Sequence, residues 1–208
     1  MSAASGLWLA AQPLVLASGS ETRRDMLVAT GIPVETHKPD VDERAIEARL
    51  TEAGATSSEI AQALAAHKAR AVSLALPGRI VLGADQTLSC DGQRFHKPPD
   101  ETAAQVQLAA LSGKAHRLHS AFVLVRDGEV LSEGVSVARM TMRSLSRGFI
   151  TAYAKAAGPA VTTSVGGYQI EGLGVQLFET IEGDHSTILG LPLLPVLGAL
   201  RSLDCLAR

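Results

Sequence analysis

The sequence contains few aromatic residues. Aromatic side chains make up only 3% of its 208 residues, as one Trp, two Tyr and four Phe. Hydrophobic residues nevertheless reach 46%, so Ala, Leu and Val must supply most of the core. A chain of this length and composition can form one large domain or two small lobes.

The sequence also lacks a strong excess of charge of one sign. Its formal net charge is −2, which argues against a partner such as a nucleic acid polymer held by bulk attraction. The only two cysteines, Cys90 and Cys205, match neither a metal motif nor a disulfide framework, so we expect a reducing, cytoplasmic location. No apolar run is long enough to span a membrane, and we expect no membrane partner.

The start of the chain lacks positive charge. No Lys or Arg precedes Arg23, and Pro13 interrupts the apolar stretch, which disfavours a signal peptide. We expect residues 1–12 to form a loose leader and residues 13–208 to form a single domain.

Strands and helices alternate along this domain without a strict βαβ order, which predicts an α/β fold with a mixed sheet. Hairpin turns are expected at Asp91-Gly92 and Asp127-Gly128. A helix is expected over residues 59–76, and its apolar face is predicted to contain Ile60, Leu64, Ala71 and Leu74.

The stretch ASGSETRR, residues 17–24, follows a predicted buried strand. Ser20 is a predicted helix N-cap, and backbone N–H groups at such a terminus can bind an anion together with the Ser18 hydroxyl. Arg23 and Arg24 lie at the end of the helix where its dipole disfavours cations, and a bound phosphate would offset that cost. The alternative is an ordinary capping serine followed by two solvated arginines.

Asp85 ends the apolar strand RIVLGAD, where α/β folds place their ligands. Its carboxylate could bind a metal or act as a base on water. The alternative is an aspartate that only caps the following turn.

Other charged residues have weaker signals. Two prolines follow Lys97 and would present its ammonium from a rigid loop, although it could be an ordinary surface lysine. Glu43 and Glu47 share one helical face, either as metal ligands or as a solvated helix start. Lys68 lies on an alanine-rich helix, where a lysine is usually solvent-facing.

The segment SVGGYQIEGLG, residues 164–174, contains four glycines, which indicates tight turns or close approach to a ligand. Glu171 within it could accept hydrogen bonds from the edge of a nucleobase. The alternative is a glycine-rich hairpin without a ligand.

Together these motifs resemble the Maf family of nucleoside triphosphate pyrophosphatases. The matching segments occur in the family's order from about residue 13 to residue 200: LASGSETRRDML (16–27), VDE (41–43), HKA (67–69), GADQTL (83–88), KP (97–98), LSG (111–113), GGYQIEGLG (166–174), IEGD (181–184) and GLP (190–192). Each segment alone is weak evidence, whereas nine in order are strong evidence.

The resemblance implies an elongated fold like that of inosine triphosphate pyrophosphatases, with two lobes beside a cleft and a mixed sheet. It implies hydrolysis of a nucleoside triphosphate to a monophosphate and pyrophosphate, assisted by Mg²⁺ or Mn²⁺. By position, Asp85 matches the catalytic acidic residue and, with Glu43, the metal-associated residues. The residues matching the polar and basic groups around the triphosphate are Ser18, Arg23, Arg24, Lys68 and Lys97.

Three positions divide this family by substrate, and here they hold Thr22, Gln86 and Glu171. Members that prefer dTTP and UTP resemble one another in having Arg, Thr and Gln there. Members that act on 7-methyl-GTP have Trp, Gln and Glu. Thr22 matches neither pattern, so the chain resembles the 7-methyl-GTP type or a group of broader specificity. His96 also departs from the family, in which glycine usually precedes this Lys-Pro.

Two other classes of function compete with an enzyme. One is a nucleotide-binding regulator of cell division without turnover, since the family is associated with septum formation. The other is a plain anion-binding module, which would not need Gln86 and Glu171. The intact acidic and basic positions favour the enzyme. The family also makes a homodimer an expected assembly.

Overall fold

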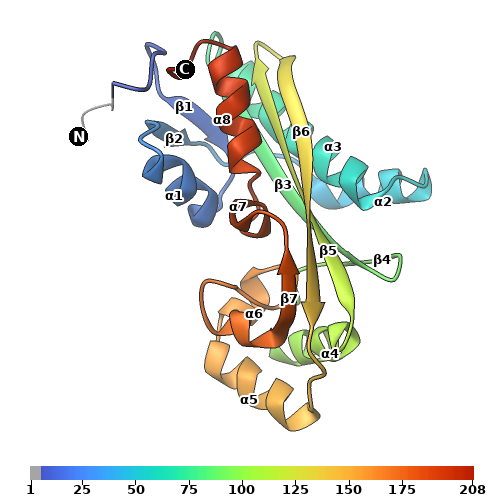
Figure 1. The fold of residues 1–208 in the computed structure, drawn as a ribbon. Coiled ribbons are helices and arrows are strands. Elements are labelled where there is room, and N and C mark those ends of the chain that lie inside the picture. Colours follow the sequence, from blue (N-terminus) through green and yellow to red (C-terminus); the bar gives the residue numbers. More distant parts are fainter. Residues whose placement is uncertain (1–5) are drawn as a thin grey trace.

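The computed structural model describes residues 6–208, which form a mixed seven-stranded sheet with helices on both faces (Figure 1). The strand order is β2-β1-β3-β5-β6-β7, and β4 pairs with β3 beside this path. β1 lies parallel to β2 and β3, whereas the other pairs are antiparallel. The expected α/β fold with a mixed sheet is confirmed.

The helices and strands have the following bounds in chain order: β1 Leu14–Ala17, α1 Glu21–Ala29, β2 Val34–Thr36, α2 Glu43–Glu52, α3 Ser57–Ala75, β3 Val81–Cys90, β4 Gln93–Phe95, α4 Glu101–Leu111, β5 Ala115–Arg126, β6 Glu129–Met142, α5 Arg147–Ala157, α6 Ala160–Thr163, the 3₁₀ helix η1 Leu173–Leu177, β7 Phe178–Glu182, α7 His185–Ile188 and α8 Leu193–Ser202. Within residues 6–208, no helix is both long and apolar enough to cross a membrane.

Three long strands, β3, β5 and β6, run through both ends of an elongated molecule (Figure 1). At one end, α4, α5 and α6 pack on the sheet and enclose a core that includes Tyr153 and Tyr168. At the other end, α1 and α8 cover one face of the sheet, and α3 covers the opposite face. The two ends are the two lobes that the resemblance implied.

Both predicted hairpin turns are present. Asp91-Gly92 joins β3 to β4, and Asp127-Gly128 joins β5 to β6. All four residues have φ between 51° and 82°, the left-handed conformation that two-residue turns between antiparallel strands require.

The segment before β1 is bound to the C-terminus rather than loose. Trp8 forms a β-bridge with Leu206, and its side chain is buried. The backbone N–H of Leu9 donates to the carbonyl of Cys205 at 2.9 Å. The prediction of a loose leader is therefore wrong for the bridged residues, and residues 1–5 lie outside the described part.

The helix α3 lies unusually close to β3 because the residues between them are small. Ala61, Ala65 and Ala69 face the sheet, and Gly83 on β3 lies beneath them. A Cβ atom placed on Gly83 would lie 2.1 Å from the carbonyl oxygen of Ala65 and 2.9 Å from the Cβ of Ala69. These small residues thus allow α3 to approach β3 closely beside Asp85. The prediction that Asp85 ends its strand is wrong, because β3 continues to Cys90 and its pairing with β5 extends beyond Asp85.

This contact also corrects the predicted apolar face of α3. Ile60 and Leu64 are buried as expected, but Leu74 is 70% exposed and Ala71 is only half-buried. The alanine stripe, together with Val72, forms the buried face instead. Leu74 is excluded from the buried face because the close approach of the helix to the strand favours small side chains at the contact.

We expect Gly83→Ala to destabilise the fold by about 1–3 kcal/mol, since the added methyl group overpacks a contact made of backbone atoms. Gly148→Ala in α5 is the matched control, because a Cβ atom there would meet nothing within 4 Å. The control should leave stability unchanged or raise it by about 0.5–1 kcal/mol. Urea unfolding followed by circular dichroism measures both, and equal effects would contradict the close contact.

Candidate functional site

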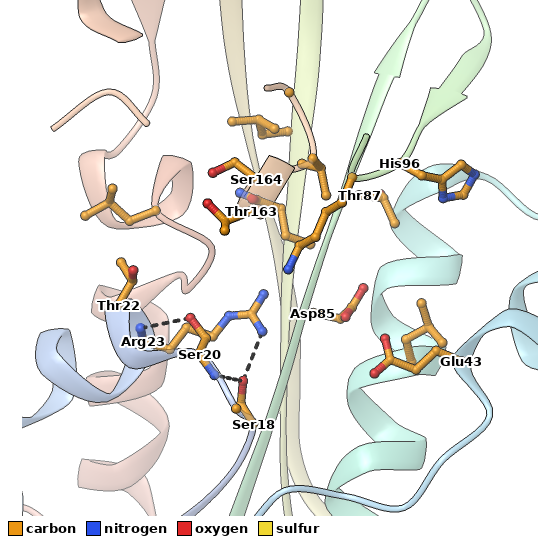
Figure 2. A pocket seen from close by; sticks show the side chains of 18 of the residues that line it. Ser18, Ser20, Thr22, Arg23, Glu43, Asp85, Thr87, His96, Thr163 and Ser164 are labelled. Carbon is orange, nitrogen blue, oxygen red and sulfur yellow. Dashed lines mark hydrogen bonds between the residues drawn. The ribbon is translucent and has the colours of Figure 1, made fainter. Parts of the chain in front are cut away.

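A cleft of about 1160 Å³ is lined by residues of both lobes (Figure 2). One wall carries Ser18 and Arg23 after β1, and the opposite wall carries Glu43 of α2. Asp85 of β3 lies between them, and Thr163 and Ser164 of the second lobe lie above. Three of the predicted motifs, ASGSETRR, VDE and GADQTL, therefore meet around one cavity although they are far apart in the sequence.

The chemical centre of the cleft is a lysine held between two carboxylates. The Lys68 Nζ lies 2.6 Å from Asp85 Oδ1 and 2.8 Å from Glu43 Oε2. The Lys68 side chain is only 8% exposed, so the expectation of a solvent-facing lysine is wrong. Small residues around it on α3 let the helix approach β3, which brings the ammonium within reach of Asp85.

The environment of Asp85 is suited to proton transfer. Burial raises the pKa of its carboxyl group, while the positive charges of Lys68 and Arg23 oppose this shift. A carboxylate with a raised pKa is a stronger base than one in water. Its oxygen atoms also lie beside cations that can hold phosphate groups.

Arg23 is fixed by three hydrogen bonds. Its Nε donates to the carbonyl of Gly190 at 2.8 Å, and its Nη1 donates to the carbonyl of Ala84 at 3.0 Å and to Ser18 Oγ at 3.3 Å. Ser20 is the N-cap of α1, as predicted, because its Oγ accepts from the Arg23 N–H (Figure 2). The guanidinium therefore has a defined position at the helix N-terminus.

Arg24 does not share this position, contrary to the prediction. Its guanidinium is exposed and pairs with Asp25 at 2.8 Å, and Arg24 is not among the residues that line the cleft. Successive residues of a helix point about 100° apart, so two adjacent arginines at a helix start cannot face one ligand equally.

Gln86 lines the cleft, but its amide nitrogen is already used by the protein. Nε2 lies 3.0 Å from Ser120 Oγ and 3.0 Å from each of the carbonyls of Thr187 and Ile188. Carbonyls can only accept, so they fix the amide orientation. The Gln86 Oε1 accepts no hydrogen bond within residues 6–208, so it is the group left for a ligand.

The remaining predicted residues also line the cleft. Thr22 is half-buried, whereas Lys97 and Glu171 are exposed. Neither Lys97 nor Glu171 has a side-chain hydrogen bond or ion pair within residues 6–208, so each is available to a ligand. All the predicted site residues except Arg24 thus reach the same cavity.

The sequence analysis named Glu47 and His96 but missed Arg94, the partner of Glu47 at the cleft. Arg94 of β4 lies 3.3 Å from Glu47 of α2, and both line the cavity. His96 lies 3.7 Å from the same carboxylate. The signal was available, because Arg94 and His96 alternate along one face of the strand and its extension. His96 directly precedes Lys97 in the chain, and Arg94 lies three residues before it.

We expect Lys68→Met to destabilise the protein by about 3 kcal/mol, because it leaves two carboxylates, one of them buried, without their shared cation. The loss should shrink when Asp85→Asn is added, which a double-mutant cycle in urea measures. Arg24→Met is the control, since its exposed ion pair should be worth less than about 1 kcal/mol. Additive effects of Lys68→Met and Asp85→Asn would contradict the buried pair.

Comparisons with known proteins agree on one family. The family model described as Maf-like protein matches residues 13–203. A nucleoside triphosphate pyrophosphatase from Nitrobacter winogradskyi is 54% identical over 198 residues, which cover 94% of this chain and 96% of that protein. A 7-methyl-GTP pyrophosphatase from Brucella abortus is 53% identical over 193 residues, which cover 93% and 97%.

A solved structure of the Staphylococcus aureus Ham1 protein also matches, with a TM-score of 0.43 and 15% identity over 63% of this chain and 72% of that one. The family rests on the sequence matches, which span nearly the whole chain and include every segment around the cleft. This chain is a member of the Maf family.

Proposed function

We propose that this protein hydrolyses nucleoside triphosphates to a nucleoside monophosphate and pyrophosphate. Membership of the Maf family and the names of its relatives, nucleoside triphosphate pyrophosphatase and 7-methyl-GTP pyrophosphatase, support this activity. The observation that carries it is the cluster of Lys68, Asp85 and Glu43, which lies in one cleft with Arg23 and Lys97. The cluster combines a base with cations that match a triphosphate.

The two carboxylates also fit a divalent cation. Both Asp85 and Glu43 contact one atom, Lys68 Nζ, so their oxygens converge on a common region. The described residues contain no group of three or more His, Cys, Asp or Glu that could hold a metal alone. Two carboxylates plus substrate phosphates are a typical set for Mg²⁺, and Mn²⁺ accepts the same oxygen ligands. A bound cation would neutralise charge on the phosphates.

Different residues of the cleft would bind the phosphates and transfer the proton. Arg23, Lys68 and Lys97 would bind and orient the triphosphate, with the Arg23 fork fixed by the protein before binding. Asp85 would accept a proton from water as the water oxygen bonds to the α-phosphorus. The bond from that phosphorus to the bridging oxygen breaks, and pyrophosphate leaves with the electron pair.

We expect Asp85→Asn to lower the rate of pyrophosphate release by about 10³-fold, because an amide cannot accept the proton. Release is measured with Mg²⁺ and a panel of UTP, dTTP, CTP, GTP, 7-methyl-GTP, ITP and ATP. Asn has nearly the same shape, so circular dichroism should show an unchanged fold. Near-normal turnover would remove Asp85 from catalysis. Nucleotide binding without turnover in the unsubstituted protein would favour the regulator instead.

We also propose that the cleft prefers a guanine-type base. Gln86 offers only its carbonyl oxygen, and Glu171 offers only carboxylate oxygens, so this part of the cleft presents acceptors. Guanine carries donors at N1 and at the exocyclic amine, whereas the matching edge of uracil has a single donor. A 7-methylated guanine is also positively charged, which a carboxylate attracts.

We expect Glu171→Gln to lower kcat/KM for GTP and 7-methyl-GTP about ten-fold relative to UTP, since a charge-assisted hydrogen bond is lost. Glu179→Gln is the matched control, because Glu179 is an exposed residue of β7 and does not line the cleft. An equal loss for all nucleotides, or an equal effect of the control, would exclude this role for Glu171.

A cytoplasmic location is part of the same proposal. Both cysteines, Cys90 and Cys205, are free and buried, as expected of a protein kept in a reducing compartment.

A further inference from the structure

The glycine-rich loop, residues 164–174, forms the second-lobe wall of the cleft and carries Glu171. Its glycines are required by close contacts. A Cβ atom on Gly166 would lie 2.2 Å from the Tyr168 ring, and one on Gly174 would lie 2.4 Å from the carbonyl oxygen of Gln169. Gly167 has a φ of 72°. The loop is therefore folded tightly around Tyr168.

Tyr168 is the residue that fastens this loop to the sheet. Its side chain is 5% exposed, and its hydroxyl lies 2.6 Å from Nε2 of His116 on β5. The Tyr168 ring packs edge-on against Phe178, with the ring centres 4.8 Å apart. Phe178 also packs against His116, so the three rings form one buried cluster.

His116 provides a neutral and fixed partner for the hydroxyl. Its side chain is 1% exposed, and burial lowers its pKa to about 4, so it carries no charge near neutral pH. Its Nδ1 is buried and has no hydrogen bond within the described chain. Keeping such an unpaired atom is unfavourable. The hydrogen bond between Nε2 and the Tyr168 hydroxyl is therefore the one polar contact of this imidazole within residues 6–208.

We propose that the hydrogen bond between His116 and Tyr168 positions the glycine-rich loop so that Glu171 contacts the nucleobase. This inference rests on the proposed function. Tyr168 is three residues from Glu171, whereas the proposed chemistry occurs at Asp85 and Lys68 in the other lobe. His116 and Tyr168 are therefore positioning residues for substrate selection and not catalytic residues.

The test compares Tyr168→Phe with Tyr153→Phe. Tyr153 is a second buried tyrosine in the same core, but its hydroxyl lies 3.4 Å from the Gly167 carbonyl and makes a weaker bond. The first measurement is hydrogen exchange of residues 164–174 in the protein without nucleotide. We expect exchange to be about five-fold faster or more in Tyr168→Phe, as one buried hydrogen bond implies, and nearly unchanged in Tyr153→Phe.

The second measurement separates KM from kcat for GTP and UTP. Tyr168→Phe should raise KM for GTP about five-fold and leave kcat within about two-fold, since Asp85 and Lys68 are not disturbed. His116→Phe should raise the KM for GTP in the same way. His116→Gln keeps a polar group near the position of Nε2, so its KM for GTP should be lower than that of His116→Phe. A merely structural role would lower the amount of folded protein without changing the KM of what remains.

The outcomes distinguish this inference from the proposed function. Faster loop exchange with a raised KM for GTP alone supports the inference. Unchanged exchange, unchanged KM, or an equal fall in kcat for both nucleotides overturns it. If the unsubstituted protein releases no pyrophosphate from any nucleotide, the proposed function fails; the nucleotide Kd then replaces KM, and an unchanged Kd in Tyr168→Phe would overturn the inference separately.

Discussion

The contact between α3 and β3 at Gly83 determines where Lys68 and Asp85 meet in the cleft. With no side chain at Gly83 and a stripe of alanines on the helix, the two backbones meet directly. Lys68 lies between Ala65 and Ala69 on the helix, and Asp85 lies two residues after Gly83 on the strand, so their charged atoms are 2.6 Å apart. A larger residue at the contact would separate the ion pair as well as the two elements, which ties the packing of the core to the site.

The cation between Asp85 and Glu43 explains how two acidic groups can share a narrow part of the cleft. Their repulsion is offset by Lys68, whose own burial is tolerated because it is paired on both sides. The arrangement is compact before any ligand arrives. A triphosphate and a divalent cation would exchange these internal contacts for contacts of similar charge, so binding need not create an unpaired buried group.

The two walls of the cleft are built by different means. The wall at β1 and α1 is fixed through Arg23, which joins Ser18, Ala84 and Gly190, and through Gln86, which holds the segment around Ile188. The second-lobe wall depends on tight glycine turns around one buried tyrosine. In the proposed function the first wall would hold the triphosphate, which all nucleoside triphosphates share, and the second would contact the base, which differs among them.

The local features and the family could be predicted from the amino-acid sequence. The Ser20 cap and both hairpin turns follow from residue types at short spacing, which local backbone preferences govern. The family follows from the resemblance of nine motifs that occur in its order. Which charged side chains face the cleft depends on how distant segments pack together. Arg23 but not Arg24 lines it, Lys68 is buried rather than solvated, and the Gln86 nitrogen is already bonded. The partners of these side chains lie 17 to 167 residues away in the chain. The periodicity of a helix or a strand does not predict contacts between residues so far apart in the sequence.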